Sequence, residues 1–272
     1  MYWHNVGKDI TPRNFNRHLS FFAPRAKQNI GHKVKAILIF TVLFTMAGLL
    51  YAEESIMVVT ENWKPYNYQE SGVVKGSSTQ IVREVLDRAG VTYDIRIYPW
   101  ARTYFMAQKE KNVMIYTIIR TPLREDLFKW IRPLGKADTV SFYKLKGRKD
   151  IVIDSLEDVK KYKVGLVRED VKHQYLISQG FENGRHIEPV ETQEQNINKL
   201  RLKRIDLIVF SQRNYSSEMS SFKALENKVE EVFILFEAIP YMAFSISTSD
   251  EMVERIVKSY DQLVVEGRIK RF

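Results

Sequence analysis

The chain has 272 residues, of which 28% are charged, with no cysteine and a formal net charge of +9 at pH 7. Seven of its 42 Lys and Arg residues, against one acid, precede Glu53, so 35 basic residues face 32 acidic ones in the remaining 220 residues. This nearly balanced remainder argues against nucleic acid as a partner, and its lack of cysteine and its two histidines argue against disulfides, thiol catalysis and a metal site.

An export signal is predicted near the N-terminus. Lys33 and Lys35 precede an apolar run over residues 36–50. This run is shorter than the roughly 20 residues of a membrane-spanning helix. We expect a signal peptide over about residues 34–52, cleavage after Ala52 and a periplasmic mature protein, with an uncleaved N-terminal anchor as the alternative. Residues 1–33 form a basic, aromatic-rich N-terminal extension, and a translation start at Val34 would leave a signal of ordinary length.

Strand-length apolar runs then alternate with helical periodicity. The first half of the chain after residue 53 predicts a strand over 56–60, a helix over 79–89 ended by Gly90, a strand over 91–98 ended by Pro99, a helix over 100–109 and a buried strand over 113–117. Strands separated by helices predict parallel sheets whose two faces are both covered.

The second half repeats this order. A helix that starts at Ser155, with Asp158 completing a capping box, leads into a strand over 163–167, and a helix over about 195–203 leads into a strand over 205–210. Two segments are alike, 109–117 and 203–211, because each is a basic helix end followed by a buried strand that ends in a hydroxyl residue. We expect each of them at the centre of one lobe, and a final helix over 250–266.

These elements predict an α/β protein of two lobes, each a mostly parallel sheet flanked by helices, joined by two crossover strands within the extended stretches 140–146 and 238–246. We expect residues 53–142 and 241–272 in lobe I and residues 143–240 in lobe II. Ligands of parallel sheets bind outside the carboxyl ends of the strands. The expected edge of an interlobe site is therefore marked by Thr60, Thr117, Val167 and Ser211.

Arg124 is the first residue that suggests chemistry. Thr121 and Pro122 predict a helix start, and a cation in the first turn opposes the helix dipole. Such a position is typical of a site where an arginine and free N–H groups hold an anion, with a carboxylate bound as a fork. The alternative is a surface ion pair with a neighbouring acid, and Arg120 is a second candidate for the anion.

Aromatic and charged loops follow the predicted strands. Trp63 comes after the strand over 56–60 and Trp100 after the strand over 91–98, and such rings either stack on a ligand or pack against their own lobe. Asp170 is expected to cap the next helix beside Arg168, although the pair also fits a plain charged loop.

The chain carries no recognisable catalytic machinery. The sequence lacks a Gly-x-Ser-x-Gly elbow, a metal triplet and a glycine-rich phosphate loop, and its best His–acid pair is His173 near Asp170. Two lobes with aromatic and arginine side chains suit the capture of a small molecule by closure. We therefore expect no enzyme and no cofactor; a dehydratase-like enzyme on this scaffold would need a base in the cleft.

With these features the chain resembles the bacterial periplasmic solute-binding proteins of family 3, the polar amino-acid type. The likeness covers nearly all of residues 53–272. It rests on four segments in the family's order: Asn62-Trp63-Lys64-Pro65-Tyr66, Thr121-Pro122-Leu123-Arg124 before Phe128, Ser155-Leu156-Glu157-Asp158 leading to Lys163-Val164-Gly165, and Arg204-Ile205-Asp206. The resemblance implies a type II periplasmic binding fold, a small-molecule ligand, an ABC permease as partner and a monomer.

Carried over by position, the resemblance implies an aromatic platform at Trp63 and a carboxylate-binding arginine at Arg124, which favours the ligand over the surface ion pair. The full predicted ligand-binding set is Arg124, Trp63, Thr117, Tyr116, Ile119, Arg168, Asp170, Trp100 and Ser211.

The chain departs from the family where an amino group would bind. Amino-acid-binding relatives usually have an acid where this chain has Ser211, and Ser77-Ser78 follow Gly76 where an acid is common. Glu61 or Asp170 are the substitutes that the sequence offers. A carboxylate without an amine therefore fits as well as an amino acid, and a membrane sensor remains an alternative partner to the importer.

Overall fold

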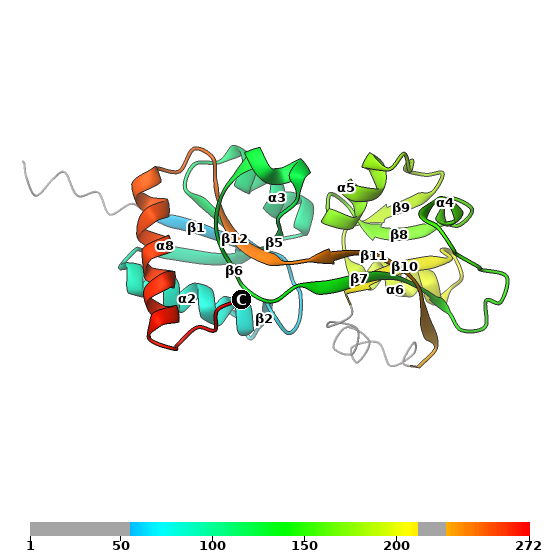
Figure 1. Ribbon diagram of the computed structural model, residues 1–272, viewed down its shortest axis with the longest axis horizontal. Helices are drawn as coiled ribbons and strands as arrows, with labels where there is room; N and C mark the ends of the chain where they lie inside the picture. Colours follow the sequence, from blue (N-terminus) through cyan, green and yellow to red (C-terminus); the bar gives the residue numbers. More distant parts are fainter. Residues whose placement is uncertain (1–54, 212–226) are drawn as a thin grey trace, which may run out of the picture. The chain divides into compact units, whose positions relative to one another are not determined.

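The computed structural model describes residues 55–211 and 227–272. The predicted export signal and the cleavage site after Ala52 lie outside these residues. The described residues form two five-stranded sheets with helices on their faces, which are called lobe I and lobe II below (Figure 1). None of the described helices is long and apolar enough to cross a membrane.

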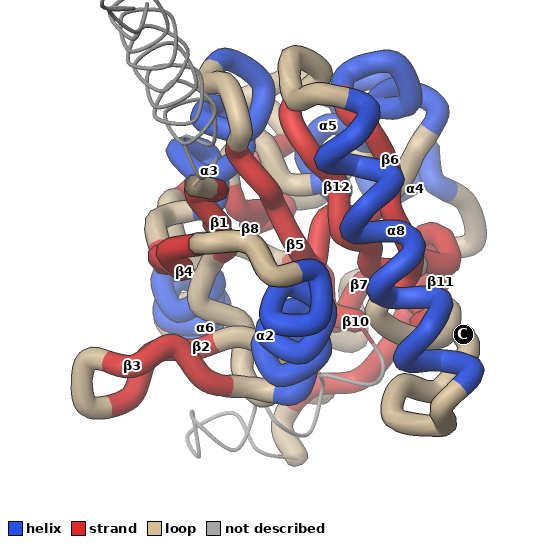
Figure 2. The backbone as a smooth tube through the Cα atoms, turned by 90° about the vertical axis from the view of Figure 1, so that its left-hand side faces the viewer, coloured by secondary structure: helices blue, strands red, loops and turns tan. Residues whose placement is uncertain are grey.

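Lobe I is built on a sheet with the strand order β4-β1-β5-β12-β6. Strands β4, β1 and β5 are parallel, and β12 runs antiparallel to both β5 and β6, so four of the five strands share one direction. Helices α2 and α8 pack side by side on one face, and α3 covers the other (Figure 2). The elements are β1 (Ile56–Thr60), α2 (Ser77–Ala89), β4 (Tyr93–Ile97), α3 (Trp100–Lys109), β5 (Val113–Ile119), β6 (Phe128–Pro133), β12 (Pro240–Ser245) and α8 (Asp250–Val265), with a small hairpin of β2 (Tyr68–Glu70) and β3 (Val73–Lys75).

Lobe II has the strand order β11-β7-β10-β8-β9. Strands β9, β8 and β10 are parallel and β7 runs antiparallel to both β10 and β11, so one strand again opposes the other four. Helix α6 packs on one face, and α4 and α5 pack on the other. The elements are β7 (Asp138–Leu145), α4 (Leu156–Val159), β8 (Val164–Val167), α5 (Val171–Ser178), β9 (Ile187–Val190), α6 (Gln193–Arg201), β10 (Leu207–Ser211) and β11 (Val229–Ala238).

The two similar segments are central, as predicted: β5 and β10 are the middle strands of their sheets. The crossings differ in detail from the prediction. β7 lies wholly in lobe II from Asp138 onward and β12 lies in lobe I from Pro240 onward, so the chain passes between the lobes at residues 134–137 and returns at Ile239. The stretch predicted as the second crossing is thus mostly a strand of lobe I, because its apolar residues pair with β5 and β6.

The helix predicted at Thr121 is a short 3-10 helix, η1 (Pro122–Leu127), and the Thr121 side chain makes no capping hydrogen bond. Its turn is tight because the Arg124 N–H donates to the carbonyl of Thr121, three residues earlier. Phe128 then adopts an extended conformation and starts β6. The local sequence thus starts a helical turn, which ends at Leu127 because β6 begins at the next residue.

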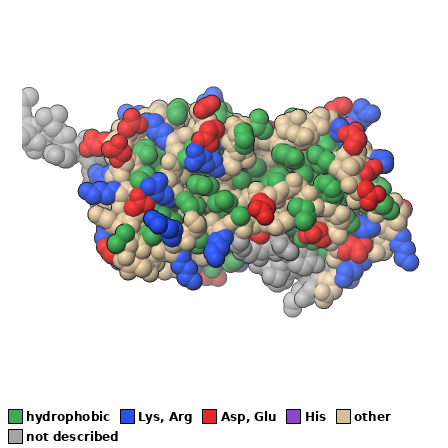
Figure 3. All heavy atoms as spheres, in the orientation of Figure 1, with side chains coloured by type: hydrophobic (Ala, Val, Ile, Leu, Met, Phe, Trp, Pro, Cys, Tyr) green, Lys and Arg blue, Asp and Glu red, His purple; other side chains and the backbone are tan. Residues whose placement is uncertain are grey.

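Charged side chains of both signs are interspersed around the face of the molecule that Figure 3 shows. On this face, neither the basic nor the acidic side chains of the described residues form one continuous patch. This distribution agrees with the nearly balanced charge of the chain after Glu53.

The predicted capping box of α4 is present. The Ser155 side chain accepts from the Asp158 N–H, and Asp158 Oδ2 accepts from the Ser155 N–H at 3.0 Å. Hydrogen bonds from Lys161 and then from Ser155 lower the pKa of Asp158 to about 2. Because this pKa lies below the value of an unfolded carboxyl, the stabilisation is present above about pH 4 and is lost as the pH falls toward 2.

Replacing Asp158 by asparagine is therefore expected to lower the thermal unfolding midpoint near neutral pH. The gap between the wild type and Asp158→Asn should narrow as the pH falls from 4 to 2, because the wild-type carboxylate is then protonated. Unfolding scans across this pH range check the expectation. The exposed Asp126→Asn on η1 serves as the control, and a gap that stays constant with pH would contradict the assignment.

Candidate ligand-binding site

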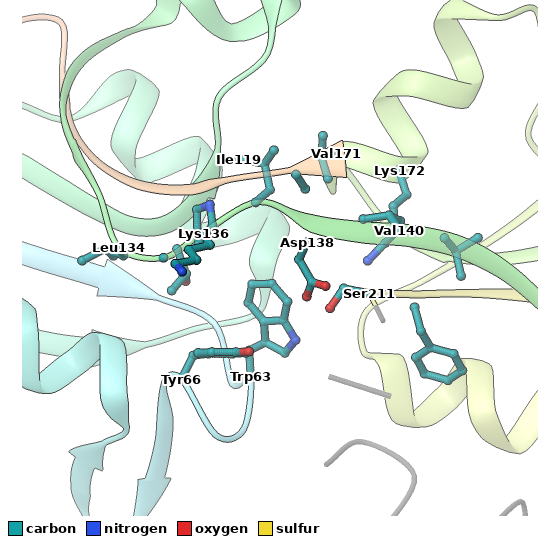
Figure 4. Close-up of a pocket in the computed structure, with 16 residues that line it drawn as sticks. Trp63, Tyr66, Ile119, Leu134, Lys136, Asp138, Val140, Val171, Lys172 and Ser211 are labelled. Carbon is teal, nitrogen blue, oxygen red and sulfur yellow. The ribbon is translucent and has the colours of Figure 1, made fainter. Parts of the chain in front are cut away.

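A pocket lies between the lobes, at the carboxyl ends of the two central strands (Figure 4). It encloses about 690 Å³ of space, including the solvent at its open mouth. Lobe I contributes the end of β5 and the loop after β1, and lobe II contributes the end of β10 and the start of α5. The first crossing and the residues on either side of Ile239 also line the pocket. The lining residues are Trp63, Tyr66, Thr117, Ile119, Leu134, Gly135, Lys136, Asp138, Val140, Val171, Lys172, Val209, Phe210, Ser211, Ala238 and Pro240.

Thr117 is a β-bulge at the pocket wall. Its φ is 61°, a left-handed conformation that is rare for a β-branched residue, and the pairing of β5 with β12 shifts register at this point. The alternation of side chains changes there as well: Met114 and Tyr116 face α2 and α8, whereas Ile115 and Ile118 face α3. Backbone strain of this kind costs about 1–3 kcal/mol and is concentrated at functional sites.

The loop that carries Trp63 and Tyr66 is held by its own backbone. The Trp63 N–H donates to the Asn67 carbonyl, and the Tyr66 and Asn67 N–H groups donate back to the Trp63 carbonyl. The Tyr66 carbonyl accepts the N–H groups of Ser78 and Thr79 at the start of α2. The two rings meet edge to face with centroids 5.4 Å apart, so they form a firm aromatic wall.

The polar side chains of the pocket come mainly from lobe II and the first crossing. In the view of Figure 4, Asp138, Lys172 and Ser211 direct their polar ends toward the same part of the pocket, to the right of the Trp63 ring. The Ser211 hydroxyl oxygen is buried and has no hydrogen-bond partner among the described residues. Lys172 Nζ lies 3.0 Å from Asp170 Oδ2 at the rim. A ligand with both a negative and a positive group can be matched here.

Arg124 does not line this pocket. The side chain is buried, with 1% of its surface exposed, and its guanidinium donates to Gln174 Oε1 at 2.8 Å and to the carbonyls of Ile119 and Glu169 at 3.2 and 3.3 Å. The guanidinium carbon lies 5.4 Å from the Trp100 ring centre and 4.9 Å from that of Tyr104. Burial lowers the pKa of Arg124 below its ordinary value, although an arginine stays charged at neutral pH.

Six of the other predicted residues fall into two groups. Trp63, Thr117, Ile119 and Ser211 line the pocket together. Trp100 contacts Arg124, and Asp170 caps α5 by accepting from the His173 N–H.

The remaining two predicted residues neither line the pocket nor contact Arg124. Arg168 forms an exposed ion pair with Glu191, whose atoms are 3.1 Å apart. Tyr116 is buried in lobe I, where its hydroxyl lies 2.8 Å from the Thr79 hydroxyl and burial raises its pKa to about 12. Their predicted ligand contacts remain predictions.

Sequence reasoning did not select Lys136 and Asp138. They lie in and just after the first crossing, where no motif marks them, and they reach the pocket because the chain turns there from β6 to β7. Asp138 places an acidic side chain in the same pocket as Ser211. The sequence signal that could have identified Asp138 is its opposite charge to Lys136, two residues earlier, in a segment that connects the lobes.

Within residues 55–211 and 227–272, no group of three or more His, Asp and Glu side chains is placed to hold a metal ion. The pocket is lined by aromatic, apolar, hydroxyl and charged side chains, a composition that suits an organic ligand.

Comparison with solved structures supports the fold. The chain is similar to a histidine kinase sensor domain with similarity to periplasmic binding proteins, with a TM-score of 0.70 and 16% identity over 79% of this chain and 92% of that one. An ancestral arginine-binding protein bound to arginine has a TM-score of 0.65 and 20% identity, over 79% and 94% of the two chains. The arginine-, lysine-, histidine-binding protein ArtJ from Geobacillus stearothermophilus has a TM-score of 0.65 and 18% identity, over 79% and 91%.

No curated protein sequence matches the chain. The family model of the bacterial extracellular solute-binding proteins, family 3, matches residues 56–272, which include both sheets and every lining residue of the pocket. The expected two-lobed periplasmic-binding-protein fold is confirmed. The chain belongs to the bacterial extracellular solute-binding proteins of family 3.

Proposed function

We propose that this protein is a periplasmic solute-binding protein that captures a small carboxylate-bearing solute in the interlobe pocket and passes it to an ABC importer. The observation that carries the proposal is a pocket whose walls come from both lobes and from the first crossing between them. A ligand in such a pocket gains contacts only when the lobes close, so binding shifts the protein toward the closed form that a membrane partner recognises.

The pocket chemistry supports an amphipathic ligand. Lys136 and Lys172 supply cations for a carboxylate, and the Ser211 hydroxyl adds a hydrogen-bonding group. Trp63 and the apolar residues around it suit the body of the ligand. Asp138 supplies an acid for an amino group, so an amino acid fits this pocket without the acid that relatives carry at the position of Ser211.

The structural neighbours support the two candidate partners. Two of them are arginine-binding proteins, which favours an amino acid or a related compound. The histidine kinase sensor domain favours a second function, in which the same closure acts on a membrane receptor. A permease reconstituted with this protein distinguishes the two, because only the transport function predicts uptake of the ligand that depends on the binding protein.

The direct test is a thermal-shift screen of residues 53–272 against amino acids, hydroxy acids, dicarboxylates, polyamines and short sugars. The screen should include pairs that differ only in an amino group, because the member with the amine is preferred only if an acid such as Asp138 binds it. A ligand at a hundred times its Kd adds about 2.7 kcal/mol of stability. No shift with any carboxylate, or a shift with sugars or polyamines alone, would refute the proposal.

Trp63→Ala is expected to weaken binding of the ligand that this screen identifies by about 2 kcal/mol, or about thirty-fold in Kd. The reason is the loss of the largest ring in the pocket wall. Titration calorimetry measures the change, and Trp63→Phe is the matched control because it keeps an aromatic face. Equal affinity of Trp63→Ala and the wild type would remove the aromatic wall from the binding site.

A further inference from the structure

The pocket wall at the end of β5 depends on the bulge at Thr117. The bulge changes which way the following side chains face, because it adds a residue that β12 does not match. Ile118 packs on the α3 side of the sheet, and Ile119 lines the pocket two residues after the bulge. A slip of one residue would turn these side chains to the opposite faces. The shape of the wall therefore depends on the contacts that hold Thr117 in its left-handed conformation.

Thr60 lies beside this bulge, at the carboxyl end of the neighbouring strand β1. The pairing of β1 with β5 ends at Val59 and Ile115, so the backbone ladder stops before the bulge. Beyond the ladder, the Thr60 hydroxyl donates to the Tyr116 carbonyl at 3.2 Å and lies 3.2 Å from Thr117 Oγ1. The Thr117 hydroxyl donates to the same carbonyl. Two hydroxyls and one carbonyl thus form a hydrogen-bonded group at the end of the ladder.

Thr60 is itself held firmly in lobe I. Its side chain is buried, and its carbonyl accepts from the Tyr98 N–H at 3.0 Å and from the Thr103 hydroxyl at 3.2 Å. Thr60 is not part of the pocket lining that the described residues form. Any effect of its hydroxyl on a bound solute must therefore pass through Thr117.

We infer that Thr60 is a positioning residue of the pocket, whose hydroxyl holds Thr117 in the left-handed conformation of the bulge. Left-handed backbone is rare for a β-branched residue, so Thr117 needs specific contacts to keep it. The hydroxyl of Thr60 supplies one of them to the Thr117 side chain and another to the carbonyl just before it. The inference rests on the proposed function only in taking this pocket as the solute site, because the conformation of Thr117 is measurable without a solute.

Four variants separate the hydroxyl from the rest of the Thr60 side chain. Thr60→Val removes the hydroxyl at nearly constant shape, and Thr60→Ser keeps it. Thr117→Gly takes a positive φ without strain, so the double variant Thr60→Val/Thr117→Gly should no longer need the hydroxyl. We expect Thr60→Val to lower the folding equilibrium constant about fivefold in the wild type and less than twofold in the Thr117→Gly background, as measured by urea unfolding. Thr60→Ala also removes the hydroxyl and replaces Thr60→Val if that variant does not fold.

NMR gives a readout at the bulge itself. In protein isotope-labelled at threonine, the Cα and Cβ chemical shifts of Thr117 report its backbone conformation, and the signal that is missing from Thr117→Gly identifies this residue. We expect left-handed shifts in the wild type and in Thr60→Ser, and shifts displaced toward extended values in Thr60→Val. Thr92→Val is the matched control, because Thr92 is exposed at the amino end of β4.

Identical Thr117 shifts in Thr60→Val and the wild type would overturn the inference, as would an equal cost of Thr60→Val in the wild type and in Thr117→Gly. The panel compound with the largest thermal shift serves as the binding probe: its Kd should rise about fivefold in Thr60→Val and return to within about twofold in Thr60→Ser. Failure of the proposed function is a separate result, because it appears as a screen without shifts, whereas unfolding and NMR use no solute.

Discussion

Replacing Gly76 by alanine is expected to lower the free energy of unfolding by about 3 kcal/mol or more and to abolish ligand binding in the pocket. Gly76 has a φ of 123°, which side chains rarely tolerate, and a Cβ there would lie 2.2 Å from the Tyr66 carbonyl oxygen and 2.4 Å from its carbon. Both atoms are backbone and cannot swing aside. The whole loop that carries Trp63 and Tyr66 would have to move.

The loss of binding follows from the hydrogen bonds at this contact. The Tyr66 carbonyl accepts from Ser78 and Thr79, and the Pro65 carbonyl accepts from Ser77, so the start of α2 fixes the loop. Moving the loop breaks these bonds and displaces the aromatic wall of the pocket. Gly76 thus links the stability of lobe I to the geometry of the site.

Gly72→Ala is the matched control. Gly72 also has a positive φ, 79°, but an added Cβ would meet nothing within 4 Å. Its cost should be limited to about 1 kcal/mol of conformational strain, with binding unchanged. Urea unfolding and titration with the ligand from the screen measure both effects. Similar losses in the two variants would show that the contact with Tyr66 is unimportant.

Much of the fold was predictable from local patterns. The strand Ile56–Thr60 and the helix Trp100–Lys109 have the predicted bounds, because Pro99 and the apolar periodicity mark them clearly. The capping box at Ser155 was also predictable, since Ser and Asp three residues apart satisfy each other's backbone N–H groups. In each case the signal lies within a few residues of the element that it specifies.

Strands β6 and β9 were not predicted, because each is extended through pairing with a strand elsewhere in its sheet and not through a local sequence pattern. Strand β6 mixes large apolar and basic residues and is extended because it pairs with β12, more than a hundred residues later in the chain. Strand β9 contains Pro189 and pairs only with β8 at the edge of its sheet. Pairing partners far away in sequence give no local pattern.

The candidate site was predictable only in part for the same reason. Ser211 ends β10 and Thr117 lies two residues before the end of β5, and the rule that ligands bind outside the carboxyl ends of strands found both. Asp138 depends on the path of the crossing, and the surroundings of Arg124 depend on how the lobes meet. The sequence identifies Arg124 as unusual but does not reveal that Gln174, fifty residues later, is its partner.

Arg124→Ala is expected to lower the free energy of unfolding of the ligand-free protein by about 3 kcal/mol. The change removes a buried cation and leaves the carbonyls of Ile119 and Glu169 without one of their donors. Arg120→Ala is the control four residues away: Arg120 is 40% exposed and pairs with Glu125 at the surface, so its loss should cost at most about 1 kcal/mol.

A double-mutant cycle tells whether the cost arises between the lobes. If Gln174 stabilises the protein mainly through Arg124, then Gln174→Ala should cost much less in the Arg124→Ala background than in the wild type, giving a coupling of about 1 kcal/mol or more. Arg120→Ala and Gln174→Ala share no contact and should be additive within about 0.5 kcal/mol. Urea unfolding of the single and double variants provides these values. Additivity of Arg124→Ala with Gln174→Ala would mean that the stabilisation by Arg124 does not pass through Gln174 and resides in its other contacts, with the Ile119 and Glu169 carbonyls and the Trp100 and Tyr104 rings.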